Sequence, residues 1–368
     1  MLFLNRSRRS GPSMPSDVME RNTMPKSTYA SQSNAMAVIP TLNEEAHIEA
    51  CIRSLLVGDK ALQEIPLVIA DGGSHDRTVE IVEGLKGEFT NLIVLKNPKR
   101  LQAAAINLAV EAFGSDHTDY MVRCDAHSIY PPNFILDVVD SLKSTQAASV
   151  VVPMDAIGQS CFEKANAWVS NTILGSGGSA HKAGRKSGYV DHGHHAGFDL
   201  RVFKKVGGYD DTFSHNEDAE YDARVAQQGG RIFLNADIRI QYVPRSSATA
   251  LARQYFNYGK GRARTIRKHQ EVLKLRQALP IVALLANLMS LIAAPFIWWT
   301  LLLPIMYLLV LGAASLVIAI SKRSICGLYA GVVSFAIHMS WAAGFLRETI
   351  LPKRSGTASP LVSTQKPL

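Results

Sequence analysis

The sequence has few cysteines and none of the spacings that mark a disulfide framework. The four of them, at positions 51, 124, 161 and 326, are scattered and form no CxxC pair. Cys124 lies in a predicted core strand and Cys326 in an apolar segment, where cysteine behaves as a small buried hydrophobic residue. We therefore expect free cysteines in a reducing compartment.

Several common signatures are also missing. The sequence has no G-x-G-x-x-G fingerprint and no Walker lysine, so neither a dinucleotide fold nor a P-loop explains its polar loops. Residues 1–33 are rich in Ser, Pro, Met and Arg and lack the apolar core of a secretory signal. We interpret this stretch as a disordered tail.

The positive charge is concentrated in one belt. The net charge is +8, and residues 253–276 carry eight Lys and Arg side chains against the single acid Glu271, whereas residues 31–252 are net negative. The belt precedes a long apolar run, where basic residues are typical of a cytoplasmic flank on anionic lipid. This placement disfavours nucleic acid as a partner.

The C-terminal third is long and apolar enough to enter a membrane. No charged residue occurs from Pro280 to Ile320, a stretch that as one helix would be about 60 Å long, roughly twice the hydrocarbon core. We expect a hairpin of two spans that turns near Thr300–Pro304. Ile325–Leu346 is a third apolar segment, and the charges after it leave open whether it spans, re-enters or lies along the membrane.

Composition predicts five segments. These are a tail at 1–33, an α/β domain at 34–250, a basic juxtamembrane segment at 251–279, a membrane region at 280–346 and a tail at 347–368.

Short apolar runs alternate with helical patterns in the α/β domain. The runs at 35–39, 67–70, 92–95, 120–125 and 149–152 have no polar alternation, and helices of 10–14 residues separate the first four. This pattern is typical of a mostly parallel sheet covered on both faces. We expect Asn43 to cap a helix from Glu44, and Asp76 or Ser74 to cap one from about Arg77.

Polar residues follow the strands where ligands of such sheets bind. Thr41, Glu44, Asp71, Arg100 and Asp125 all lie near predicted strand carboxyl ends. Carboxylates there bind a nucleoside or a metal on a diphosphate, and an arginine faces a phosphate. Each motif alone is explained better as an ordinary loop.

Two further stretches have alternative interpretations. The glycine-rich loop 175–188, with Lys182 and Arg185, either closes over a phosphorylated ligand or is a flexible linker. Asp191-His-Gly-His-His195 resembles zinc ligands, but no second cluster matches it, and adjacent histidines on a strand point to opposite sides. We therefore do not expect structural zinc.

An acidic helix start follows at 214–220. Ser214 with Glu217 matches a capping box, and Asn216 is the alternative cap. The positive end of the helix dipole would keep Asp218 ionised, so that it can act as a base without a metal.

Taken in order, these blocks resemble the family 2 glycosyltransferases of GT-A fold. The resemblance covers about residues 35–269. It rests on Ile39-Pro-Thr-Leu-Asn-Glu-Glu45, Ala70-Asp-Gly-Gly-Ser-His-Asp76, Arg100 followed by Asn107, Arg123-Cys-Asp-Ala-His127, Gly207-Gly-Tyr-Asp210 and Asn216-Glu-Asp218.

The resemblance implies roles for individual residues. The set implied to hold the uridine and its diphosphate is Pro40, Thr41, Glu44, Asp71, Arg100 and Asp125. Asp125 matches the metal-binding acid of the DxD element, with His127 in place of the second acid, and the cofactor would be Mg²⁺ or Mn²⁺. Asp218 matches the catalytic base. Separately from the resemblance, candidates for contacting the acceptor and its diphosphate are Glu217, Arg253, Lys182 and Arg185.

The resemblance also implies an activity. It is the inverting transfer of a sugar, glucose in a β-1,3 linkage, from a UDP-sugar to a polyprenyl-diphosphate-linked saccharide during exopolysaccharide (succinoglycan) repeat-unit assembly. The implied location is the bacterial inner membrane with a cytoplasmic catalytic domain, and other polysaccharide-assembly proteins are candidate partners. Two alternatives stay open: transfer to polyprenyl monophosphate, and a catalytically silent membrane scaffold.

Overall fold

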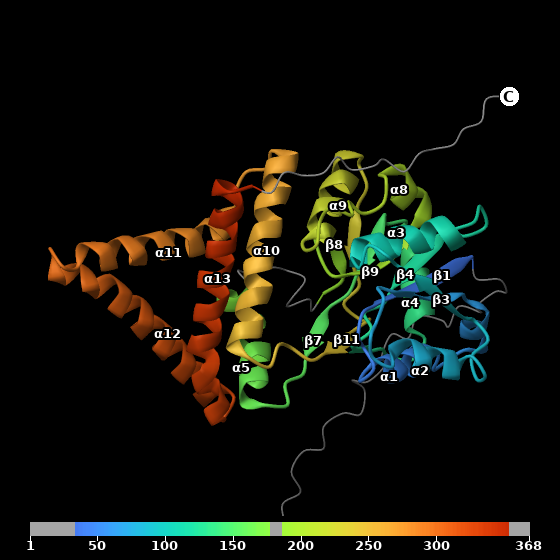
Figure 1. Ribbon diagram of the computed structural model, residues 1–368, viewed down its shortest axis with the longest axis horizontal. Helices are drawn as coiled ribbons and strands as arrows, with labels where there is room; N and C mark the ends of the chain where they lie inside the picture. Colours follow the sequence, from blue (N-terminus) through green and yellow to red (C-terminus); the bar gives the residue numbers. More distant parts are fainter. Residues whose placement is uncertain (1–33, 177–185, 353–368) are drawn as a thin grey trace, which may run out of the picture. The chain divides into compact units, whose positions relative to one another are not determined.

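A computed structural model of the chain describes residues 34–176 and 186–352 (Figure 1). The predicted tail at 1–33, most of that at 347–368, and both Lys182 and Arg185 lie outside the described residues. An eight-stranded sheet has the order β3-β2-β1-β4-β9-β6-β10-β8. Its strands are β3 Leu92–Lys96, β2 Leu67–Asp71, β1 Ala35–Thr41, β4 Tyr120–Arg123, β9 His195–Asp199, β6 Ser149–Val151, β10 Ile232–Leu234 and β8 Gly188–Val190.

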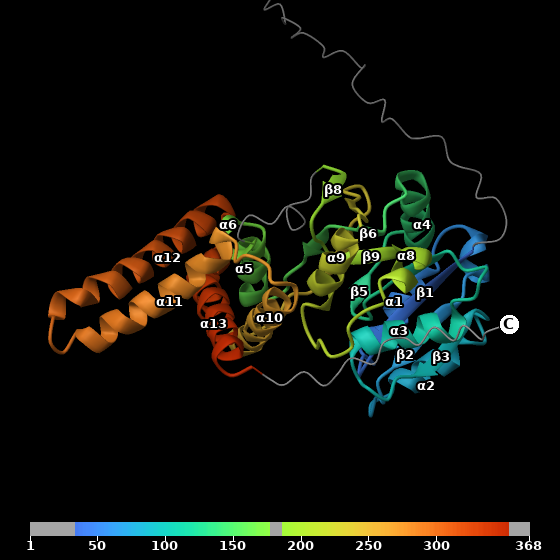
Figure 2. The ribbon, with the colours of Figure 1, turned by 90° about the horizontal axis from the view of Figure 1, so that it is seen from above.

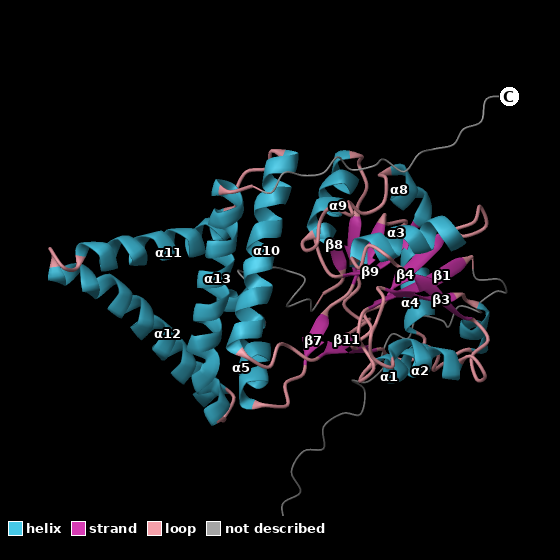
Figure 3. Cartoon of the chain, in the orientation of Figure 1, coloured by secondary structure: helices cyan, strands magenta, loops and turns pink. Residues whose placement is uncertain are grey.

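The sheet is mostly parallel, as predicted. Strands β3, β2, β1, β4, β6 and β10 run in one direction, while β9, inserted between β4 and β6, and the edge strand β8 run in the other. A smaller sheet has the order β5-β11-β7, with β5 Ser128–Ile129, β11 Ile240–Tyr242 and β7 Met154–Ala156. Figure 3 shows both sheets among the helices.

Helices cover both faces of the large sheet because its strands bury side chains on both sides. In β1, Ala37 and Ile39 pack toward α1, α2 and α4, whereas Met36 and Val38 pack toward α3, α8 and α9. The helices of this part are α1 Ile48–Leu55, η1 Lys60–Glu64, α2 Thr78–Leu85, α3 Gln102–Phe113, α4 Phe134–Thr145, α5 Cys161–Ser170, α6 Ile173–Ser176, α8 Leu200–Lys205 and α9 Glu217–Gln227.

Two predicted helix caps are wrong. Asn43 has φ of 57°, and its Oδ1 accepts a hydrogen bond from the His75 amide at 2.8 Å, so it joins two loops while α1 begins later, at Ile48. Asn216 also has a left-handed backbone, with φ of 66°, and no side chain caps α9. Asparagine tolerates this backbone region and therefore serves as a turn residue at both places. The Asp76 carboxylate does accept a hydrogen bond from the Thr78 amide, at the start of α2.

Three C-terminal helical segments are long and apolar enough to cross a membrane: Leu275–Ala293, Trp298–Ser321 and Ile325–Ile350. The elements are α10 Ala248–His269, α11 Leu275–Ala293, η2 Trp298–Leu301, α12 Leu302–Ser321, η3 Ile325–Tyr329 and α13 Ala330–Ile350. The predicted hairpin is formed by α11 and α12, which project together from α13 (Figure 1).

The hairpin turns earlier than the sequence predicts. Its turn occupies residues 294–301, where the Thr300 hydroxyl donates to the Ser290 carbonyl at 2.9 Å. Pro304 lies inside the first turn of α12. Proline is tolerated there because the N–H groups of the first turn have no partner within the helix. The proline therefore starts a helix here and does not mark the turn.

Helix α13 lies lengthwise against α10, as Figures 1 and 2 both show. In the candidate span Ile325–Ile350, which contains α13, 39% of the most apolar 18-residue stretch is buried inside the structure. The corresponding share is 11% in each of the other two candidate spans. Two glycines let the backbones touch, since a Cβ on Gly259 would meet the Trp341 carbonyl oxygen at 2.0 Å and one on Gly344 would meet the Phe256 carbonyl oxygen at 2.0 Å. The segment whose path the sequence left open is thus a packing partner of the basic helix.

The prediction of free cysteines is only half correct. Cys51 and Cys124 are free and buried, whereas Cys161 and Cys326 form a disulfide that joins α5 to η3. The paired residues are 165 positions apart, so local spacing gives no sign of the bond. Disulfides persist mainly in oxidising compartments, so this pair does not match the reducing environment that the sequence predicts.

Candidate active site

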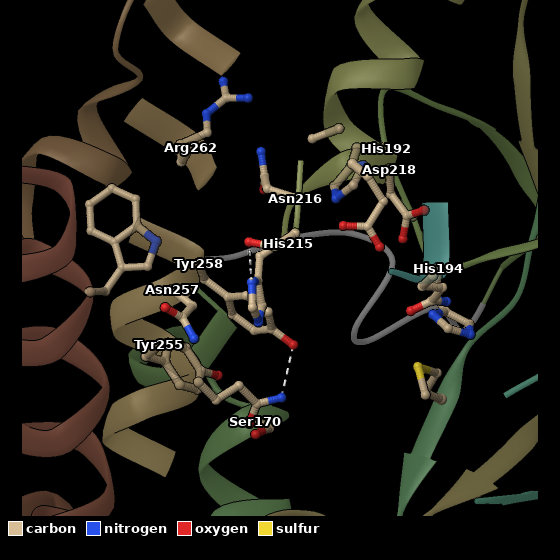
Figure 4. A pocket seen from close by; sticks show the side chains of 18 of the residues that line it. Ser170, His192, His194, His215, Asn216, Asp218, Tyr255, Asn257, Tyr258 and Arg262 are labelled. Atoms are coloured by element: carbon tan, nitrogen blue, oxygen red, sulfur yellow. Dashed lines mark hydrogen bonds between the residues drawn. The ribbon is translucent and has the colours of Figure 1, made fainter. Parts of the chain in front are cut away.

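A single cleft of about 1810 Å³ connects the carboxyl edge of the sheet with the C-terminal helices. The predicted site residues that line it are Pro40, Thr41, Glu44, Arg100, Asp125, His127, Glu217, Asp218 and Arg253. Its other wall includes Tyr258 of α10 and Trp341 of α13, together with residues of α11 and α12. In Figure 4, His194 and Asp218 lie on one side of the cleft and Tyr258 lies on the other.

Asp71 is the one predicted nucleotide-binding residue that is not among the residues lining the cleft. Its carboxylate accepts hydrogen bonds from the amides of Gly73 at 2.8 Å and Ser74 at 3.1 Å. Asp71 therefore shapes the turn after β2. Thr41 fits a binding role better, because its buried hydroxyl has no hydrogen-bond partner among the described residues and lies at the cleft.

Asp218 is held by a buried arginine that the sequence did not point to. Arg123 is 5% exposed, and its Nη1 donates to Asp218 Oδ1 at 2.6 Å. The Tyr209 hydroxyl donates to the same oxygen at 2.7 Å. Both hydrogen bonds go to Oδ1, and within the described part of the chain Oδ2 has none.

These neighbours keep Asp218 ionised. Burial acts to raise the pKa of Asp218, but the Arg123 guanidinium, His195, His194 and the Tyr209 hydrogen bond outweigh it and hold the pKa well below its usual range. From the sequence, the helix dipole was expected to have this effect. A direct ion pair with Arg123 is the larger cause in the structure.

Asp125 shares the same arginine. Its Oδ1 lies 3.7 Å from Arg123 Nη2, and its Oδ2 lies 3.5 Å from His194 Nε2. Burial acts to raise the pKa of Asp125, but His194, Arg123 and His127 together lower it. Arg123 thus brings the two acids, 125 and 218, to one point of the cleft.

The histidines at 192–195 divide between two carboxylates. His192 Nδ1 and His195 Nε2 bind the two oxygens of the buried Asp222, at 2.6 and 2.8 Å, one turn beyond Asp218 in α9. His194 is directed instead at Asp125. The adjacent His194 and His195 therefore face different partners, as predicted, although only His195 lies in a strand, because β9 begins there.

The chemistry around Asp125 fits a divalent cation shared with a diphosphate. Within residues 34–176 and 186–352, no three His, Cys, Asp or Glu side chains are grouped to hold an ion by themselves. A cation that keeps water and substrate phosphates needs only one or two protein ligands. His127 is half-exposed, and its Nδ1 lies 3.4 Å from Glu44 Oε1, which raises the pKa of His127 ahead of any effect of Asp125.

Glu217 has the opposite character to its neighbour. Burial, and secondly the charge of Asp218, raise the pKa of Glu217 to about 7. The pKa values of the two adjacent carboxyls at the start of α9 are therefore shifted in opposite directions, that of Asp218 downward and that of Glu217 upward.

Comparisons with known proteins define the class. The model of glycosyl transferase family 2 matches residues 36–207. Together with the relatives below, this match shows that the chain belongs to glycosyl transferase family 2, and the protein is a glycosyltransferase with a GT-A-like fold.

Individual relatives are more specific. The chain is 41% identical over 322 residues to the succinoglycan biosynthesis protein ExoA of Rhizobium meliloti (strain 1021), covering 86% of this chain and 96% of that protein. It is 24% identical over 238 residues to a dolichyl N-acetyl-alpha-D-glucosaminyl phosphate 3-beta-D-2,3-diacetamido-2,3-dideoxy-beta-D-glucuronosyltransferase of Methanococcus voltae, covering 63% and 73% of the two chains. The solved mannosyltransferase PcManGT of Pyrobaculum calidifontis shares the fold, with a TM-score of 0.55 at 16% identity over 88% of this chain and 89% of that one.

Proposed function

We propose that this glycosyltransferase moves a sugar, glucose in a β-1,3 linkage, from a UDP-sugar to a polyprenyl-diphosphate-linked saccharide. The reaction belongs to exopolysaccharide (succinoglycan) repeat-unit assembly at the bacterial inner membrane, with the catalytic domain on the cytoplasmic side. The name of the Rhizobium meliloti relative supports the pathway, and the name of the Methanococcus voltae relative describes transfer to a lipid-phosphate-linked sugar.

The observation that carries the proposal is the shared lining of the cleft. Asp125 and Asp218 lie at one end, and residues of the apolar helices, including Pro280, Tyr307 and Trp341, lie at the other. A saccharide attached to a membrane lipid could therefore reach the acids without leaving the lipid. Arg253 is exposed on α10 and lines the same cleft. We propose it as the residue that binds the acceptor diphosphate.

In the proposed reaction Asp218 is the general base. The acceptor hydroxyl attacks the anomeric carbon from the face opposite the UDP, and its proton passes to Asp218 Oδ2, the oxygen without a hydrogen bond to the described residues. Arg123 and Tyr209 hold Oδ1 and so fix the direction of Oδ2. A carboxylate of low pKa is sufficient because the hydroxyl becomes strongly acidic as its bond to carbon forms.

The donor would lie along the strand ends. Thr41, Glu44 and Arg100 line the cleft. In this proposal Thr41 and Glu44 bind the nucleoside, and Arg100 would face the departing diphosphate. Mg²⁺ or Mn²⁺ held at Asp125 would neutralise charge on the leaving UDP. His127, the second ligand that the sequence suggests, also lines the cleft.

A transfer assay tests this function. Purified protein in detergent is incubated with UDP-[¹⁴C]glucose and lipid extract, with and without Mn²⁺ or Mg²⁺, beside an Asp218→Asn variant. We expect a disaccharide on lipid diphosphate that the variant does not form. An acid-labile sugar monophosphate would support transfer to polyprenyl monophosphate, and equal product from the variant and the wild type would overturn the assigned base. No product from any nucleotide sugar, with polymer still made in cells carrying the variant, would support the scaffold alternative.

A further inference from the structure

We infer that His194 is a protein ligand of the divalent cation at Asp125, in place of His127. The inference rests on the metal dependence included in the proposed function. It assigns a ligand that the family's DxD element, here Asp125-Ala-His127, does not contain.

The segment before β9 is built so that His194 reaches β4. The His194 carbonyl accepts a hydrogen bond from the Val152 amide at 3.0 Å, which fixes this residue beside the end of β6. A Cβ at Gly193 would meet Val151 Cγ2 at 2.5 Å, so the approach requires glycine at this position. The pairing of β6 with β9 also shifts register between Val150 and Val151. Such bulges redirect side chains beside active sites.

The distance between the two side chains suits ligands of one ion. His194 Nε2 lies 3.5 Å from Asp125 Oδ2, which is longer than an ordinary N–H···O hydrogen bond of about 2.7–3.2 Å. Two ligand atoms about 2.1 Å from a common cation, at roughly a right angle, are separated by about 3 Å. A small movement of either side chain closes the remaining gap.

His194 is also better placed than His127. Both side chains line the cleft, but that of His194 is 17% exposed and lies beside Asp125, whereas that of His127 is 48% exposed and is directed at Glu44. The neighbours His192 and His195 cannot substitute for His194, because Asp222 binds both of them. The carboxylate, water and diphosphate oxygens of this donor set suit Mn²⁺, and the imidazole of His194 would add one nitrogen ligand.

The test measures Mn²⁺ binding directly. The full-length protein in detergent is titrated with Mn²⁺ in the presence of UDP, by electron paramagnetic resonance, for the wild type and for His194→Ala and His127→Ala. We expect His194→Ala to weaken Mn²⁺ binding about tenfold or more and to remove the imidazole nitrogen coupling from the pulsed spectrum, and His127→Ala to change neither.

The opposite pattern, with coupling lost in His127→Ala and kept in His194→Ala, would overturn the inference. Thermal unfolding of each variant shows whether the fold is kept. His194→Gln is a second variant that removes the imidazole and keeps a polar side chain, so that loss of a ligand can be separated from loss of the fold. Asp125→Asn is measured alongside. If it binds Mn²⁺ as the wild type does, the ion is not at Asp125 and the inference falls, while the transfer assay still decides the proposed function independently.

Discussion

Replacing Asp218 by asparagine should have two separate consequences, because its carboxylate is both the proposed base and the partner of a buried cation. Loss of a positioned general base lowers a rate by about 10²–10⁴-fold. Breaking a buried ion pair on one side costs about 3–5 kcal/mol, since the remaining charge stays buried. The cost should fall at the low end of that range, because Asp125 still lies 3.7 Å from Arg123.

A double variant separates the two consequences. Adding Arg123→Met to Asp218→Asn removes the guanidinium that has lost its nearest carboxylate, and we expect it to recover part of the lost stability and none of the lost rate. The measurements are UDP release in the presence of lipid acceptor and the melting temperature in detergent. Arg239→Met is a suitable control, because it breaks the exposed ion pair with Asp155 on another part of the surface.

Two results would contradict this reasoning. A stable Asp218→Asn variant with wild-type melting temperature would mean that Arg123 does not depend on this carboxylate. A variant that is destabilised and yet transfers sugar at the wild-type rate would mean that another group takes the proton.

Three further predictions concern the surroundings of the site. Gly259→Leu should lower the melting temperature by several degrees, because its side chain would strike the backbone of α13, whereas Gly312→Leu, which meets nothing within 4 Å, should not. Because the pKa of Glu217 is raised in the folded state, the wild type should lose stability as the pH rises from about 4.5 through 7. Glu217→Gln should therefore be as stable as the wild type near pH 4 and more stable at pH 8, by at most about 3 kcal/mol. Equal pH profiles of unfolding for the two proteins would contradict this. Thr265→Val removes the hydroxyl that accepts a 2.9 Å hydrogen bond from the side chain of Asn216. We expect kcat to fall several-fold while the KM for the donor stays unchanged. Thr265→Ser, which keeps the hydroxyl, should recover the wild-type kcat.

Local sequence patterns predicted the features that depend on neighbouring residues. Apolar runs without polar alternation located β1, β2, β3, β4 and β6, because strands buried on both faces require such runs. The rule that ligands bind at strand carboxyl ends placed Asp125 and Arg100 at the cleft that the structure contains. Their roles in catalysis stay predictions.

Local sequence patterns did not predict contacts between residues that are distant in the sequence. Arg123 is a charged residue at the end of the hydrophobic strand β4, and a buried charge requires a partner. The sequence therefore indicated that a partner exists. Nothing local identified that partner as Asp218, 95 positions later. His194 is directed at Asp125 because β9 is inserted antiparallel beside β4. A strand order of this kind is not visible in the periodicity of either strand.

The close contact of α10 with α13 limits how this enzyme can be divided for study. Helix α10 also touches the turn before α9, since a Cβ at Gly261 would meet the His215 carbonyl oxygen at 2.5 Å. A soluble fragment that stops after α10 would expose the apolar strip that α13 covers and would leave α10, which contacts the turn before α9, without its packing partner. We therefore expect truncations before residue 330 to aggregate, and the catalytic half to become competent only after the last helix has been synthesised and docked.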